Sequence, residues 1–130
     1  MRRLAETFIA GMDAEGEHFT WDSTEAARLD DVCDMLLSTD PPEPVRHSMI
    51  MTMGAYLGEL MVRHGNGRWS YDADLSEAVV DMPNGLVGYP LSKVAKRIHR
   101  GPEHNLFQFY WYALTRDVPP GVQVRETPKQ

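Results

Sequence analysis

The sequence predicts an α+β fold, with a small antiparallel sheet of about three strands covered by about five helices. Two observations lead to this expectation. Apolar residues recur at helical spacing on both sides of residues 68–88, where the pattern changes to the alternation and short apolar runs of strands. Glycine and proline mark the boundaries. A chain of 130 residues fits one domain, expected at residues 1–117, with a mobile C-terminal tail at 118–130.

The first half of the chain predicts three helices. Residues 3–14 carry apolar side chains at every fourth position. Residues 23–38 come next, where Asp22 and Glu25 have the spacing of a capping box, and residues 45–64 follow a proline-rich connection. This third helix is apolar around most of its circumference, so we expect it to be the central element of the fold.

Glycines and methionines distinguish the central helix. Gly54 and Gly58 lie four residues apart on one side of it, where a missing side chain lets a neighbouring element approach closely, so we expect Gly58 to be a packing glycine. The helix also holds Met49, Met51, Met53 and Met61. These methionines either fill the core, which is the commoner use, or form an adaptable binding surface.

Three short antiparallel strands are expected next, at about 68–74, 77–82 and 85–88. Apolar and polar residues alternate in the first strand, and its apolar residues are Trp69, Tyr71 and Ala73. Because alternate residues of a strand share a face, we expect this side to lie against the central helix and Trp69 to be buried there.

Two more helices are expected after the sheet, at 90–100 and 105–115. Pro90 suits the first turn of a helix, and Gly101 suits its end. The last helix contains the aromatic segment 107–112. Aromatic side chains all around a helix are expected to be buried beneath other elements; the alternative is that they line a ligand pocket or stack on bases.

Charge is distributed unevenly along the chain. The totals of 13 Lys and Arg against 19 Asp and Glu give a net charge of −6, which argues against a protein whose whole surface binds DNA. Residues 1–60 hold 4 basic and 12 acidic side chains, a net −8, whereas residues 61–130 hold 9 and 7, a net +2. This asymmetry does not favour nucleic acid as a partner, yet it leaves room for a local basic site.

Cysteine usage and hydropathy point to the cytoplasm. Cys33 is the only cysteine, so no intramolecular disulfide forms, and its helical phase with Leu29 and Leu36 indicates a buried thiol rather than a nucleophile. No apolar stretch approaches the roughly 20 residues of a membrane span, so we expect no membrane association. The start of the chain lacks the apolar region of a signal peptide.

The acidic and histidine residues give no metal signature. Asp30, Asp31 and Asp34 match the D-D-x-x-D pattern of magnesium–diphosphate sites, but such enzymes need a second acidic motif that this chain does not hold. We expect these aspartates to form the solvated face of a helix. The five histidines include no H-E-x-x-H pair. No metal, cofactor or catalytic residue is therefore expected.

The candidate pocket residues are Glu59, Arg63 and His64, which lie close together at the end of the central helix in the sequence. Glu59 is an isolated carboxylate on an apolar helix, and Arg63 follows it at the spacing that favours an ion pair. A buried Glu59 with a raised pKa would suit a general acid or a ligand anchor. The alternative is a plain ion pair on the rim of the helix.

The candidate binding residues are Lys93, Lys96, Arg97 and Arg100, which form one basic row on the helix at 90–100. Like charges repel unless something anionic lies nearby, so this row is a candidate surface for phosphate groups, an acidic partner protein or a symmetric copy. Two other interpretations stay open. The row is a solvated face, or it meets aspartates of its own molecule at positions 30–34.

Residues 54–59, Gly-Ala-Tyr-Leu-Gly-Glu, and residues 63–69, Arg-His-Gly-Asn-Gly-Arg-Trp, resemble the signature of a family of small uncharacterised bacterial α+β proteins, common in actinomycetes. In these proteins a G-x-Y-x-G-E helix leads through a glycine turn into a Trp-bearing strand. The resemblance covers residues 45–115. It implies the α+β topology and supplies no catalytic residue or cofactor.

Three classes of function remain. The leading hypothesis is a non-enzymatic cytoplasmic binding or protein-interaction module, because the chain lacks a nucleophile, base and orienting group in a recognisable pattern. The partner would be an acidic protein or a second copy of the chain. The alternatives are an anionic-ligand or nucleic-acid binder that uses the basic helix at 93–100, and a small enzyme centred on Glu59.

Overall fold

The structure, a computed structural model that describes residues 1–117, has the expected α+β fold. Its helices are α1 (Arg2–Ala14), the 3₁₀ helix η1 (Ser23–Arg28), α2 (Leu29–Leu37), α3 (Glu43–Gly65), α4 (Pro90–Arg100) and α5 (Leu106–Thr115). Its strands are β1 (Arg68–Asp72), β2 (Glu77–Asp81) and β3 (Val87–Gly88), which form one antiparallel sheet in that order. The tail expected at 118–130 lies outside the described residues.

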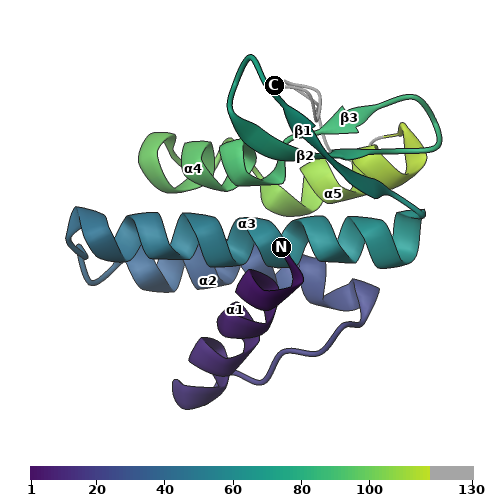
Figure 1. Ribbon diagram of the computed structural model, residues 1–130. Coiled ribbons are helices and arrows are strands. Elements are labelled where there is room, and N and C mark those ends of the chain that lie inside the picture. The colour runs from purple at the N-terminus through teal and green to yellow at the C-terminus, as the bar shows by residue number, and fades with distance from the viewer. Residues whose placement is uncertain (118–130) are drawn as a thin grey trace.

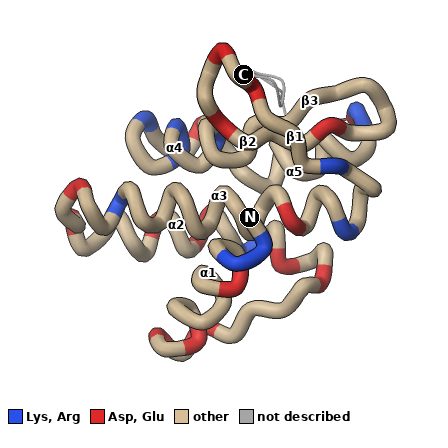
Figure 2. The backbone as a smooth tube through the Cα atoms, in the orientation of Figure 1, with Lys and Arg blue, Asp and Glu red and all other residues tan. Residues whose placement is uncertain are grey.

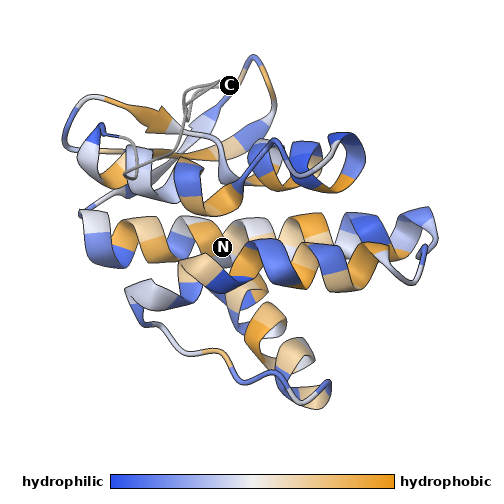
Figure 3. Ribbon diagram, turned by 180° about the vertical axis from the view of Figure 1, so that it is seen from behind, coloured by the Kyte–Doolittle hydropathy of each residue, from blue (hydrophilic) through white to orange (hydrophobic). Residues whose placement is uncertain are grey.

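The long helix α3 lies at the centre, as its composition predicts (Figure 1). Helix α1 packs on one side of it, α2 runs beside it, and the sheet with α4 and α5 lies on the other side (Figure 1). Apolar residues therefore appear around α3 and along α1 (Figure 3). Every residue from Met53 to Met61 is buried. The hydrophobic core is continuous across both sides of α3.

Gly54 and Gly58 of α3 are contact points for α4 and β1. A Cβ atom added at Gly54 would lie 2.9 Å from the Cα atom of Leu91, closer than real Cβ contacts. A Cβ atom added at Gly58 would overlap the ring of Trp69 and lie 3.2 Å from Pro90 Cγ. The packing role predicted for Gly58 is confirmed.

The helix predicted at 23–38 is broken into two. Asp22 does cap its start, since its Oδ1 atom accepts from the Thr24 amide at 2.9 Å. Glu25 does not complete a capping box, because its carboxylate turns to the amide and hydroxyl of Thr20 instead. The first six residues form a 3₁₀ helix, and the α-helix begins only at Leu29.

The sheet is smaller than predicted. β1 ends at Asp72 and β3 has two residues. Trp69 is half-buried and contacts α3, but Tyr71 is 66% exposed, so the prediction that the whole apolar side of this strand faces α3 is wrong. The reason is the position of β1 at the edge of the sheet. The helices cover the middle strand, whose Val79 and Val80 are both buried.

Candidate functional site

The four cations of α4 do not form one exposed row. Lys93 and Arg97 are buried, with 4% and 2% of their surfaces exposed, while Lys96 is half-buried and Arg100 is exposed. Burial lowers the pKa of Lys93 to about 8, with a further lowering from the charge of Lys96. The exposed part of the predicted binding row is therefore limited to Lys96 and Arg100.

Arg97 meets aspartates of its own molecule, which was one of the interpretations open from the sequence. Its Nε atom donates to Asp30 Oδ1 at 2.9 Å and its Nη2 atom donates to Asp34 Oδ1 at 2.7 Å. Asp34 and Asp31 are exposed, as expected. The expectation of a solvated Asp30 is wrong, because this carboxylate is largely buried against Arg97 and the start of α5. Within residues 1–117, the Nη1 atom of Arg97 has no hydrogen-bond partner.

Asp30 also holds the start of α5. Its oxygens accept hydrogen bonds from the amides of Leu106 at 3.0 and 3.1 Å and of Phe107 at 3.2 Å. These amides have no partner within the helix, and a carboxylate is favoured at this positive end. One side chain thus ties α2 to α4 and α5, which makes the Arg97–Asp30 pair part of the framework.

The structure pairs Glu59 with Arg63, as one of the two interpretations held, but the carboxylate is buried rather than exposed on the rim of the helix. Glu59 is buried, with 8% of its surface exposed, and its Oε1 atom lies 3.7 Å from Arg63 Nε. Its Oε2 atom accepts from Trp69 Nε1 at 2.8 Å. Arg63 stacks over the ring of Trp21 at 3.9 Å, and His64 Nε2 lies 2.6 Å from the Trp21 carbonyl oxygen. These side chains fasten β1 and the 15–22 loop to α3.

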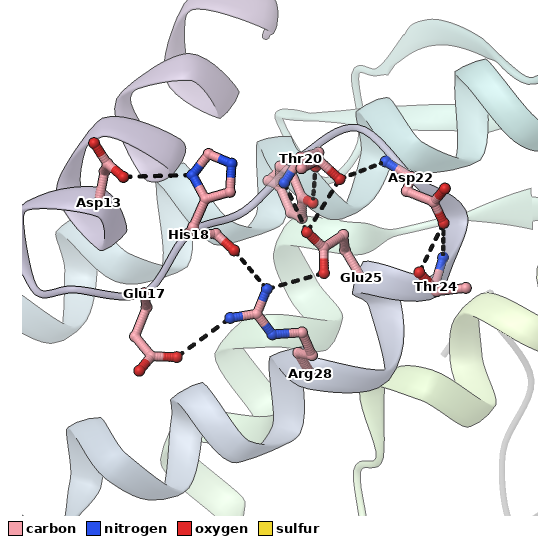
Figure 4. Close-up of polar contacts among 9 residues, drawn as sticks. Asp13, Glu17, His18, Thr20, Asp22, Thr24, Glu25 and Arg28 are labelled. Atoms are coloured by element: carbon pink, nitrogen blue, oxygen red, sulfur yellow. Dashed lines mark hydrogen bonds and ion pairs between the residues drawn. The ribbon is translucent and has the colours of Figure 1, made fainter.

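A polar network that the sequence did not indicate fixes the same loop from its other side (Figure 4). Glu25 is buried and accepts from the Thr20 amide at 2.7 Å and from Arg28 Nη1 at 2.9 Å. Burial acts to raise the pKa of Glu25, but the hydrogen bonds from Arg28 and Thr20 outweigh it and hold the pKa below its ordinary value. The Tyr56 hydroxyl donates to the Thr20 carbonyl at 2.5 Å. The network positions the loop.

An apolar groove of about 430 Å³ opens between α1, α2 and the start of α3. We call it the methionine groove and define it by Gly11, Met12, Met35, Leu36, Val45 and Met49. A hollow of about 190 Å³ extends it along α1 and α3 and shares four of these residues. Met35 is 50% exposed and Val45 is 43% exposed, so large apolar side chains stand at its mouth. The sequence suggested an adaptable methionine surface but placed it only on α3.

Gly11 leaves the methionine groove open from the side of α1. Apart from the adjoining residues and backbone of α1 itself, no heavy atom lies within 4 Å of the position that a Cβ atom would take there. Gly54 and Gly58 are different, since added atoms would overlap neighbours at both. The methionines of α3 divide in the same way. Met53 and Met61 fill the core, whereas Met49 and Met51 line surface hollows.

The aromatic segment 107–112 is only partly buried. Phe109 and Tyr110 are buried, as expected, with 4% and 3% of their surfaces exposed. Phe107 and Trp111 instead line a hollow of about 380 Å³ beside η1, and 37% of the Trp111 surface is exposed.

Comparisons with protein-family models, with curated proteins and with solved structures found no match to this chain. In the part of the chain that the structure describes, no helix is long and apolar enough to cross a membrane. The same residues contain no group of three or more His, Cys, Asp or Glu side chains arranged to hold a metal ion.

Proposed function

We propose that this protein is a non-enzymatic protein-interaction module of the bacterial cytoplasm, and that it binds its partner through the methionine groove. The main support for this proposal is the exposure of Met35 and Val45 at the mouth of an apolar groove that three helices form. Contiguous apolar surface that is open to water is typical of binding sites. Methionine adapts its flexible side chain to a partner's shape.

The contacts of the other candidate residues support the methionine groove as the binding site. Glu59 and Arg63 are engaged with Trp69 and Trp21, which is a packing arrangement rather than a reaction centre. The basic row keeps only Lys96 and Arg100 near the surface, which weakens the alternative of an anionic-ligand site. A cytoplasmic setting is supported by the cysteine usage, since Cys33 is the only cysteine of the sequence and is a buried free thiol.

The test fills the groove without disturbing the fold. Leucine at Gly11 adds a side chain in open space, and it also favours the helix relative to glycine, so the Gly11→Leu variant should fold. Alanine at the same position is the matched control, because it makes the same backbone change and leaves most of the groove free. Tagged wild-type, Gly11→Leu and Gly11→Ala proteins are used to capture partners from extract of the source cells, and captured proteins are identified by mass spectrometry.

We expect one protein to be captured by the wild-type and Gly11→Ala chains and lost with Gly11→Leu. The interaction is then repeated with both partners purified, by calorimetry, where Gly11→Leu should weaken binding at least about tenfold by removing the space for an apolar anchor. Equal affinities of the purified Gly11→Leu and wild-type proteins for that partner would contradict the proposal.

A further inference from the structure

We infer that the occupant of the methionine groove is an amphipathic helix of another protein, with basic residues flanking its apolar face. This inference rests on the proposed function and adds the class of partner. Three observations support it: the shape of the groove, the charges around it, and the burial of the apolar face of the basic helix that a second copy of the chain would present.

The shape fits a helix of modest length. The lining residues on this wall run from Val32 on α2 to Thr39, two residues beyond the end of that helix; these seven residue steps correspond to roughly 10 Å of helix, or about two turns. The opposing wall is made by α1 and the first turns of α3, with Gly11 leaving space between them. Two turns of a helix present apolar anchors at positions i, i+3, i+4 and i+7, the usual mode of helix-in-groove recognition.

The charges at the groove are negative and unneutralised. Glu15 lines the groove, and Asp31 stands one turn before Met35 on α2 and is exposed. Among residues 1–117, no side chain forms an ion pair with Glu15 or Asp31. A cationic group on the partner would therefore find two carboxylates that the fold does not use.

Most of the basic residues in this part of the sequence are already paired with acidic side chains. All groove residues come from positions 1–60, which carry a net charge of −8, with 4 basic and 12 acidic side chains. Three of the four cations are in ion pairs: Arg2 with Glu6 at 3.4 Å, Arg46 with Asp40 at 3.1 Å, and Arg28 with Glu25 and Glu17 at 2.9 and 3.2 Å. Acidic positions are accordingly prominent around α1 and the 15–22 loop (Figure 2). Electrostatic complementarity selects a basic partner.

A second copy of this chain does not supply such a helix from its basic element. The basic helix α4 has the required charge, but its apolar stripe of Leu91, Val94 and Ile98 is buried in its own core. Its exposed side is polar. Because the basic helix among residues 1–117 is not available in a second copy, we assign the occupant to a different protein, as a helix whose apolar face is free before binding.

The probes are two synthetic 18-residue peptides with leucine on one helical face. The first carries lysine on the remaining positions and the second carries glutamate at the same positions. Each is titrated into the full-length protein labelled with ¹⁵N at low salt, and amide shifts locate the site. We expect the lysine peptide to shift Gly11, Leu36 and Val45, and to bind at least about tenfold more tightly than the glutamate peptide.

Variants then separate the groove from general charge attraction. Glu15→Lys and Asp31→Lys should each weaken the lysine peptide by about threefold, as expected for one exposed charge pair, whereas Asp74→Lys on the distant hairpin makes the same charge change and should have no effect on the groove shifts. Gly11→Leu should abolish the shifts of Leu36 and Val45. Raising the salt concentration should weaken binding.

Each other outcome overturns the inference. Equal binding of the two peptides, or shifts outside the groove, removes the basic helix as the occupant. A concentration-dependent dimer that Gly11→Leu dissociates would identify a second copy instead. If neither peptide binds while the purified cellular partner is still lost with Gly11→Leu, the partner is not a basic helix, and the proposed function stands. If instead neither peptide binds and the purified cellular partner binds Gly11→Leu as tightly as it binds the wild-type protein, the proposed function fails as well.

Discussion

Two glycines on neighbouring helices illustrate what decides a residue's role. Gly58 lies under the ring of Trp69, where a side chain has no room, whereas Gly11 faces open space. Helical spacing in the sequence distinguished Gly58, because Gly54 stands four residues before it. Nothing in the local pattern distinguished Gly11, since the space beside it is made by the crossing of α1 with α2 and α3.

Replacing Gly58 with leucine should destabilise the protein by about 1–3 kcal/mol, because β1 and the start of α4 would be forced away from α3. Urea denaturation followed by circular dichroism measures this change. Gly11→Ala is the control, and it should stabilise the fold by up to about 1 kcal/mol through helix propensity alone. Unchanged stability of Gly58→Leu would show that the contact is not tight.

The sequence left a pairing of the basic row with aspartates at positions 30–34 as one of several interpretations, but it could not single out the pair of Asp30 and Arg97. Helical phase predicted a solvated Asp30 because phase is a local pattern, whereas the partner that covers this carboxylate is 67 positions away in the chain. Arg97→Met should cost about 3–5 kcal/mol, because it leaves the Asp30 carboxylate with an unmatched charge in a largely buried position. Lys96→Met, one residue earlier and half-buried, should cost much less in the same denaturation experiment. Similar losses for the two variants would contradict this role.

Lys93 should make stability depend on pH above neutrality. Burial lowers its pKa from 10.5 to about 8, so between these values the unfolded chain binds more protons than the folded one, and stability rises with pH. Relative to Lys93→Met, the wild-type protein should gain roughly 3 kcal/mol between pH 7 and pH 11, because the buried charge is lost. Denaturation midpoints of both proteins across this range, with Lys96→Met as control, provide the measurement. If the difference in stability between the wild-type and Lys93→Met proteins stayed constant across this pH range, Lys93 would have an ordinary pKa.

At the scale of elements, the sequence predicted most of the architecture. Helices α1, α3, α4 and α5 were expected within a few residues of their observed bounds, and α3 was expected at the centre, because apolar periodicity is a local property. The failures are non-local. The break between η1 and α2 follows from the turn of Glu25 toward Thr20, and the exposure of Tyr71 follows from the edge position of β1. The methionine groove is formed by three helices together, so the sequence indicated only a surface rich in methionine and not the groove itself.

The junction between β1 and α3 depends on one hydrogen bond as well as on ring packing. Phenylalanine in place of Trp69 keeps an aromatic ring on β1, but it removes the donor to Glu59, whose buried oxygen then lacks that partner, and also the indole atoms Cζ2 and Cη2 that lie over Gly58. We expect a loss of about 1–3 kcal/mol. Trp111→Phe changes an exposed ring and should cost about 0.5 kcal/mol or less. Equal effects of the two substitutions in thermal denaturation would contradict the importance of the Glu59 contact.

At the scale of the whole molecule, α3 joins two sides that differ in charge and in use. The acidic side carries the methionine groove, and the other side carries the sheet and the basic helix α4. One continuous core nevertheless runs through α3. On the acidic side it includes Phe8, whose ring centroid lies 4.9 Å from that of Tyr56 and 5.2 Å from that of Phe19. A disturbance of α1 should therefore be felt at the sheet.

The last prediction tests this coupling with Phe8→Ala, which should cost about 3–5 kcal/mol. Trp21→Phe and Trp111→Phe together leave Trp69 as the only tryptophan, so fluorescence then reports on β1 while far-ultraviolet circular dichroism reports mainly on the helices. If the core unfolds as one unit, Phe8→Ala shifts both urea midpoints equally, although Phe8 and Trp69 lie on opposite sides of α3. An unchanged fluorescence midpoint, with an early loss of helical signal, would show instead that α1 unfolds separately and that the methionine groove forms and dissolves independently of the sheet.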